Sequence, residues 1–248
     1  MDCLACGITA SPATREHVFS SWLLKEFGPD VSMALYRHSG DGSQQKVRDE
    51  IKLDSFRLKK ICEGCNVGWM SDLEGSAKPL ILALIKDGRQ LDSLLEDERR
   101  TLARWAAKTA IVESHAVGAE CPVSADFLKR IRTSVDGAPG RLAVAARHTG
   151  IHGFGHLQVG VIRDLIGGGK AAGNIIMIAL PKLVFACAFP MLQELPYECR
   201  RVEGFYTPLW PPARGWRPMK QTPMPMDVDE LKSLMSMAER IELFQSVV

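Results

Sequence analysis

Two Cys-x-x-Cys pairs constrain the fold of this chain more than any other feature of the sequence. They are Cys3/Cys6, near the N-terminus, and Cys62/Cys65, and 55 residues lie between them. A two-residue spacer lets both thiolates of a pair face one tetrahedral ion at about 2.3 Å. Two such pairs predict a closed four-thiolate site, which is typical of structural zinc, so we expect these cysteines to bind Zn²⁺. The enclosed loop exceeds the roughly 15–20 residues of common zinc ribbons, and we expect it to hold structure of its own.

Two alternatives to zinc stay open for these cysteines: a chance occurrence of the pairs and redox chemistry. A thioredoxin-like redox motif needs a Cys-x-x-Cys near a βαβ pattern, and neither pair has that setting. The chain has seven cysteines, an odd number, and begins without the Lys/Arg-led apolar run of a signal peptide. These two observations favour metal chemistry over a disulfide framework and lead us to expect a cytoplasmic protein.

The net charge and the hydropathy of the chain bear on two kinds of partner, nucleic acids and membranes. The formal net charge is +2, and this balance neither requires nor rules out a nucleic-acid partner. The longest apolar stretch, IIMIALPKLVFACAFP, is broken by Pro181 and Lys182, so it indicates a pair of strands. We therefore expect no membrane span.

The hydrophobic periodicity predicts an α+β protein in two parts. Residues 1–78 are expected to form a small zinc-stapled module. Residues 79–248 are expected to form an α+β domain whose role the sequence leaves unknown, with substrate recognition and oligomerisation as the candidates. The module is expected to contain a helix over 20–28, half-buried strands over 46–62 and a helix that begins after Cys65. Pro79 is expected to restart an apolar helix. The second part is expected to contain helices over 99–117, 124–135 and 228–244, and an antiparallel sheet of strands over 141–148, 154–164, 174–180 and 182–189.

Three polar residues beside the cysteines suggest hydrolytic chemistry. Metal-assisted hydrolysis of a phosphodiester needs a base with a pKa near neutral, and a histidine such as His17 suits that task. It also needs a hard cation held by few oxygen ligands, so that coordination positions remain for the phosphate. Glu16 can supply a carboxylate oxygen and Asn66, directly after the second cysteine pair, an amide oxygen. Arg15 and Arg57 are our candidates for contacting the scissile phosphate.

The order CxxC, then an acidic-His pair, then CxxCN resembles the zinc-stapled HNH endonucleases. The arrangement is most similar to the four-cysteine branch that includes junction-resolving enzymes of the endonuclease VII type. The resemblance implies a ββα-metal fold in the first third of the chain, with DNA as the substrate. It also implies that His17 is the general base, that a catalytic Mg²⁺ or Mn²⁺ binds to Glu16 and Asn66, and that structural zinc binds to Cys3, Cys6, Cys62 and Cys65.

The sequence departs from that family pattern at one position, and a second interpretation stays open. Many members carry an asparagine shortly before the second cysteine pair, where it orients the base histidine. This chain has Ser55-Phe56-Arg57-Leu58 there, and Asp54 or a backbone carbonyl of a neighbouring strand is our candidate for the orienting role. The alternative function is a catalytically inactive zinc module that binds nucleic acid or a protein partner, with Glu16 and His17 in ordinary hydrogen bonds.

Overall fold

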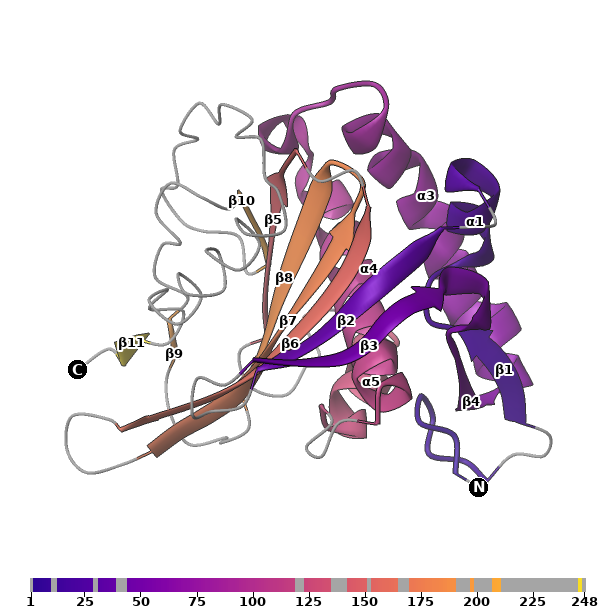
Figure 1. Ribbon diagram of the computed structural model, residues 1–248, viewed down its shortest axis with the longest axis vertical. Coiled ribbons are helices and arrows are strands. Elements are labelled where there is room, and N and C mark those ends of the chain that lie inside the picture. Colours follow the sequence, from indigo (N-terminus) through magenta and orange to yellow (C-terminus); the bar gives the residue numbers. More distant parts are fainter. Residues whose placement is uncertain are drawn as a thin grey trace.

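The structure is a computed structural model that describes residues 2–9, 13–28, 31–38, 44–118, 123–134, 142–150, 153–164, 170–190, 197–198, 207–210 and 245–246. Figure 1 shows its helices and strands along the chain. The helices are α1 (Ser21–Phe27), α2 (Glu63–Cys65), α3 (Ser71–Ile85), α4 (Glu96–Ala116) and α5 (Ala125–Ile131). The strands are β1 (Ala13–His17), β2 (Ser32–His38), β3 (Gln44–Lys52), β4 (Arg57–Cys62), β5 (Ala143–His148), β6 (Phe154–Asp164), β7 (Lys170–Leu180), β8 (Leu183–Pro190), β9 (Tyr197–Glu198), β10 (Thr207–Trp210) and β11 (Gln245–Ser246).

The first layer is a small antiparallel pair of strands, β1 and β4, followed directly by helix. Glu16 pairs with Leu58 and His17 with Arg57, and the register shifts by a bulge between Thr14 and Glu16. The chain then turns through α2 and one wide helical turn, Asn66–Met70, before α3 begins. Gly68 has non-helical dihedral angles, so the chain kinks within this turn. Two strands and a helix are thus packed around the second cysteine pair.

The second layer is a seven-stranded sheet in the order β10-β5-β8-β7-β6-β2-β3. Its strands pair antiparallel, except that β2 runs parallel to β6. Strands β2 and β3 lie in sequence between β1 and β4, so the loop closed by the cysteine pairs supplies one edge of this sheet. The rings of Phe19 and Phe27 pack edge-on against Phe154 at the start of β6, with centroids 5.8 and 5.6 Å away. The N-terminal layer and the sheet therefore share one hydrophobic core.

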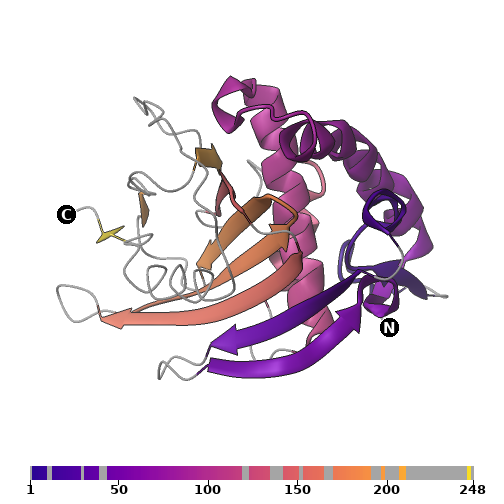
Figure 2. The same ribbon diagram turned by 45° about the horizontal axis from the view of Figure 1, so that its top comes forward.

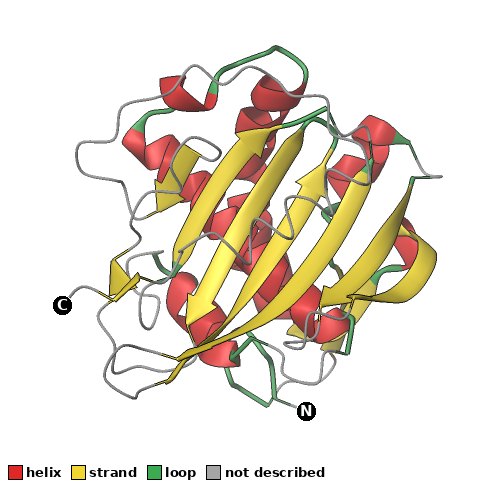
Figure 3. Cartoon of the chain, turned by 60° about the vertical axis from the view of Figure 1, so that its left-hand side comes forward, coloured by secondary structure: helices red, strands yellow, loops and turns green. Residues whose placement is uncertain are grey.

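Helix α4 packs against the sheet (Figures 2 and 3). Trp105 of α4 meets Phe185 of β8 edge-on at 5.5 Å, and Phe127 of α5 meets Phe189 of the same strand at 5.3 Å. Helix α3 packs on α4 and carries a buried stripe at helical spacing. Helix α4 also contacts β4, so it lies between the seven-stranded sheet and the β1/β4 layer. The members of the α3 stripe are Leu73, Ala77, Ile81, Leu84 and Ile85.

One polar pair is buried inside the interface between α4 and the sheet. Glu113 of α4 and His156 of β6 are at most 2% exposed, and Oε2 of the glutamate lies 2.7 Å from Nδ1 of the histidine. The two atoms are close enough for an ion pair but lack the alignment of a hydrogen bond. Burial raises the pKa of the Glu113 carboxyl, and the nearby imidazole opposes that change. The pair therefore links helix to sheet at the centre of the molecule.

The α+β class, with helices and antiparallel sheets, is confirmed, and so are the four strands expected in the second half. Pro79 does not restart a helix: it lies inside α3, because the buried stripe on either side of it is continuous and tertiary packing outweighs the hydrogen bond that proline removes. The expected division near residue 78 falls within this same helix, and the two-part division stays a prediction. The helix expected over 228–244 lies outside the described residues.

Candidate metal centre

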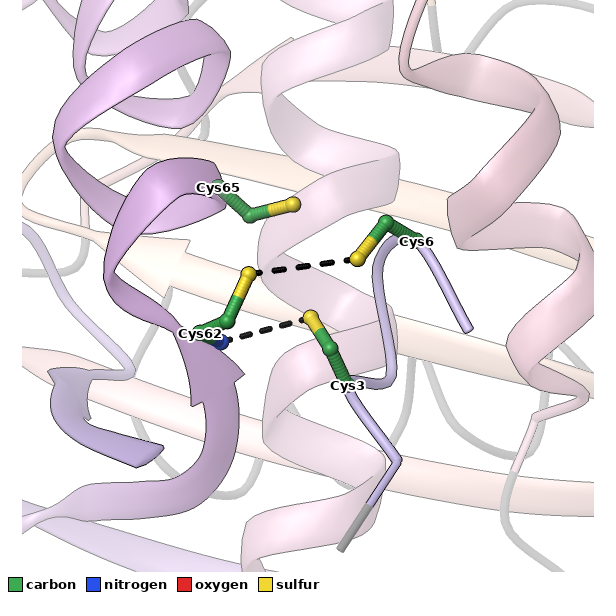
Figure 4. Close-up of side chains that lie close together, drawn as sticks. All are labelled: Cys3, Cys6, Cys62 and Cys65. Atoms are coloured by element: carbon green, nitrogen blue, oxygen red, sulfur yellow. Dashed lines mark hydrogen bonds between the residues drawn. The ribbon is translucent and has the colours of Figure 1, made fainter. Parts of the chain in front are cut away.

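Four cysteine side chains from two distant segments meet at one point, as Figure 4 shows. The sulfur atoms of Cys3, Cys6, Cys62 and Cys65 all lie within 4.8 Å of one another. Sγ of Cys6 is 3.9 Å from Sγ of Cys62, and four thiolates around a tetrahedral zinc at about 2.3 Å would be separated by about 3.8 Å. The cluster could therefore hold a metal ion such as zinc, as the spacing of the two pairs predicts.

Local backbone geometry explains why the first pair folds this way. The N–H of Gly7 donates to the carbonyl of Cys3 at 2.7 Å, and the N–H of Cys3 donates to the carbonyl of Ile8 at 3.0 Å. Gly7 has φ +75°, a left-handed conformation that glycine adopts without strain, and the tight turn depends on it. The N–H of Leu4 donates to the carbonyl of Lys60 at 2.8 Å, which fastens the turn to β4.

The surroundings of the cluster change the pKa values of its thiols in opposite directions. Burial acts to raise the pKa of the Cys3 thiol, but backbone N–H donors, first that of Cys62 at 3.3 Å from the sulfur, lower it to about 7. Burial raises the pKa of Cys65 to about 12, and the other cysteines add to the effect. The four thiols therefore do not all ionise at neutral pH on their own. A divalent ion would offset the repulsion of four thiolates and draw off the protons.

Glu16 lies on β1 and faces the two helices packed behind it. Its side chain is buried, and burial raises the pKa of its carboxyl to about 7; Lys108 of α4 opposes this increase and Glu74 of α3 adds to it. Within the described residues the Glu16 side chain makes neither a hydrogen bond nor an ion pair. Nζ of Lys108, which is completely buried, lies 2.6 Å from Oε1 of Glu74. Glu16 is thus a buried carboxylate beside an ion pair.

His17 has different surroundings, because neighbouring residues of a strand point to opposite faces. Nε2 of His17 lies 3.2 Å from Oδ1 of Asp54, in the short 3₁₀ turn that precedes β4. Arg57 donates to the same carboxylate oxygen at 2.8 Å and, through Nε, to the backbone carbonyl of Asp54 at 2.8 Å. These two partners, His17 first, lower the pKa of the Asp54 carboxyl. An ionised carboxylate only accepts hydrogen bonds, so Nε2 of His17 donates this one; in a neutral imidazole Nδ1 is then an acceptor.

The side chain of Asn66 is hydrogen-bonded to a residue of β1. Its Nδ2 donates to Oγ1 of Thr14 at 3.1 Å, and the Thr14 hydroxyl donates to the carbonyl of Ile61 at 3.0 Å. Thr14 and Glu16 are two residues apart on β1, so they share the face of the strand that looks toward the helices. The Asn66 amide oxygen has no hydrogen-bond partner within the described part of the chain. Asn66 is therefore joined to the strand that carries Glu16, whereas His17 lies at the end of that strand beside Asp54.

A cleft of about 410 Å³ opens between α3 and α4. Arg104 lines it, lies over the ring of Trp69 at 5.6 Å, and donates through Nε to the carbonyl of Ile131 at 2.6 Å. This arginine is one turn of α4 before Lys108. The remaining lining is polar or small in most positions and consists of Asp72, Leu73, Ser76, Asp97, Arg100, Thr101, Thr133 and Ser134.

Sequence reasoning missed three residues of this region: Thr14, Glu74 and Lys108. The sequence does carry one signal for the last of these, a single lysine within the otherwise small and apolar run WAAKTAIV of a long helix. A lysine in such a run is expected to be paired when buried. Arg15, named as a possible phosphate contact, is exposed on β1, and Arg57 is engaged with Asp54.

Comparison of the chain with protein-family models, with curated proteins and with solved structures found no match. Among the described residues, every helix is too short or too polar to cross a membrane.

Proposed function

We propose that this protein is a metal-dependent endonuclease of the HNH type that hydrolyses phosphodiester bonds of DNA. The observation that carries the proposal is the contact between Asn66 and β1, which brings the residue after the second cysteine pair to the strand that holds Glu16 and His17. The resemblance implies two antiparallel strands followed by a helix. It also implies that four cysteines join these elements to the N-terminal turn that holds Cys3 and Cys6.

The cysteines have a structural role in this proposal. Two of them are buried and four sulfur ligands close the coordination sphere, so zinc held there has no open position for substrate. Its contribution is to hold the N-terminal turn, the end of β4 and the start of α2 together. The second, catalytic ion is Mg²⁺ or Mn²⁺, for which Glu16 and Asn66 are the proposed ligands.

The donor set at the second position suits a hard cation. One carboxylate and one amide oxygen are the ligand types that Mg²⁺ and Mn²⁺ prefer, and two protein ligands leave positions for water and phosphate. A bound divalent ion would supply Lewis-acid stabilisation of the charge that develops on the phosphate. Thr14 orients Asn66 by accepting from its Nδ2, which leaves the amide oxygen available.

His17 is the proposed general base. Asp54 accepts the hydrogen bond from Nε2 and so fixes the ring and its tautomer, and Nδ1 can take a proton from an attacking water. Arg57 donates two hydrogen bonds to Asp54 and so helps to fix its position. The remaining N–H groups of the guanidinium are the proposed donors to the scissile phosphate. In this proposal Asp54 fulfils the orienting role that an asparagine has in many HNH enzymes.

The test is DNA cleavage by zinc-containing protein with Mg²⁺ or Mn²⁺, on supercoiled plasmid and on branched DNA. We expect Asn66→Ala to lose cleavage by about 100-fold, because it removes a proposed ligand, and Asp72→Asn, an exposed carboxylate on α3, to behave as wild type. Equal cleavage by wild type and Asn66→Ala would remove the basis of the proposal.

A second function is favoured by one observation. Glu16 is buried where the charges of Glu74 and Lys108 act on it, whereas His17 faces Asp54, so β1 by itself does not bring the Glu16 and His17 side chains together. That arrangement fits a catalytically inactive zinc module that binds nucleic acid or a protein partner. A gel shift that survives both Glu16→Ala and His17→Ala, without cleavage by the wild type under any metal, would favour it.

A further inference from the structure

The ion pair of Lys108 and Glu74 joins a helix outside the first 78 residues to the site around Glu16. The Lys108 side chain is fully buried, and its ammonium is 2.6 Å from Oε1 of Glu74, which is itself 18% exposed. A buried ammonium without a carboxylate partner is strongly unfavourable, so this lysine must be held by an acid in the interior. Two acids lie near this ammonium within the described residues: Glu74 forms the ion pair, and Glu16 is near enough for the charges of Lys108 and Glu74 to act on it.

The structure shows which of the two acids holds the ammonium. Lys108 pairs with Glu74, and within the described residues no ion pair joins it to Glu16. Glu16 is nevertheless near enough for the lysine charge to act on it. An ammonium and a divalent cation cannot share one carboxylate at full strength, because each would repel the other at short range. Where the ammonium sits therefore decides whether Glu16 is available as a ligand.

We propose that Glu74 retains the ammonium of Lys108 and thereby keeps the Glu16 carboxylate free for a divalent cation. Glu74 is then a positioning residue that acts through Lys108, and α4 is part of the site. The inference rests on the proposed function, because it takes Glu16 as a ligand of the catalytic ion.

Two variants give opposite results if this is correct. Glu74→Gln releases Lys108, which then pairs with Glu16, and we expect the affinity for Mn²⁺ to fall by about tenfold or more. In Glu74→Gln/Lys108→Met the ammonium is gone as well, and the affinity is expected to return to within about threefold of wild type. A merely structural ion pair would not produce loss in the single variant and recovery in the double variant.

The experiment is a titration of the zinc-containing full chain with Mn²⁺ alone, followed by the loss of the free Mn²⁺ signal in electron paramagnetic resonance. Glu16→Gln is the variant expected to lose binding, and Asp72→Asn is the matched control on the exposed side of α3. Urea unfolding of each protein shows whether it is folded. If Glu74→Gln does not fold, Lys108→Met carries the test, with binding at least as tight as wild type expected and weaker binding overturning the inference.

The possible failures are distinguishable. Wild type that binds no Mn²⁺ contradicts the proposed function and this inference together. Wild type that binds Mn²⁺, with Glu74→Gln unchanged or with the double variant as weak as the single one, overturns the inference and leaves the proposed function in place.

Discussion

Nε2 of His17 lies 3.2 Å from Oδ1 of Asp54, and this contact joins the end of β1 to the turn that precedes β4. The two residues are 37 positions apart, and all of α1, β2 and β3 lies between them. The carboxylate holds the imidazole in one tautomer and directs Nδ1 away from itself. In the proposed enzyme, the pair is a base and its orienting acid.

Asp54→Asn should lower the cleavage rate by about 10- to 100-fold, because an amide does not hold the imidazole in its tautomer as a carboxylate does. The measurement is the single-turnover rate on plasmid DNA with saturating Mg²⁺. Asp72→Asn serves as the control. A rate for Asp54→Asn equal to that of wild type would show that the contact has no part in catalysis.

Removal of zinc should unfold the region around the cysteines, because structural zinc supplies folding free energy on the order of 10 kcal/mol. Metal analysis of purified protein is expected to find one zinc per chain, and Cys62→Ser to lose it. Cys187→Ala is the control, since Cys187 is buried in the sheet far in sequence from both pairs. Full zinc occupancy in Cys62→Ser would contradict the four-cysteine site.

Glu16 should make the folded protein less stable as the pH rises. Its pKa is raised to about 7 by burial, so the folded state holds a proton that the unfolded chain releases near pH 4.5. The contribution of Glu16 to stability is complete below that lower value and is lost as the pH rises to about 7. Between pH 6 and pH 8 the free energy of unfolding of wild type should fall by about 1 kcal/mol relative to Glu16→Gln.

That comparison is made by urea unfolding of zinc-containing protein without other divalent ions. Adding Mn²⁺ at pH 8 should stabilise wild type and leave Glu16→Gln unchanged, because ligand binding to the folded state adds to stability. An equal effect of pH on both proteins would show that Glu16 titrates as an exposed carboxylate.

The buried Glu113–His156 pair should contribute to stability, because each side chain is the ion-pair partner of the other. Glu113→Ala and His156→Ala are each expected to lower the free energy of unfolding by about 3–5 kcal/mol, because each leaves a buried polar partner alone. The double variant Glu113→Ala/His156→Ala should lose less than the two single losses combined. Additive losses would indicate that the two side chains do not interact.

The elements that follow from local periodicity were predictable, and those that depend on distant pairing were not. The strands β5 to β8 and the helices α4 and α5 were predicted because their apolar residues recur at the spacing of each element. The parallel pairing of β2 with β6 joins residues more than a hundred positions apart, and no local pattern encodes it. Proline predicts a helix boundary, yet Pro79 lies within α3 because buried neighbours hold the helix together.

The candidate site was predictable to the extent that its residues stand next to the cysteines in sequence. The spacing of the two cysteine pairs predicted the cluster that the structure shows. Asp54 was one of two candidates for orienting His17, and its carboxylate is the group in contact. Glu74 and Lys108 were missed because their proximity to Glu16 depends on how α3 and α4 pack in the folded protein, which the sequence pattern does not contain.

The most direct test of the proposed function is the cleavage of plasmid DNA by zinc-containing wild type and His17→Ala, with Mg²⁺ or Mn²⁺ and with zinc content and folding verified for both. We expect wild type to cleave and His17→Ala to be slower by about 100-fold or more, because the variant lacks the general base. Cleavage by His17→Ala at the wild-type rate, or absence of cleavage by wild type with either ion, would contradict the proposed function.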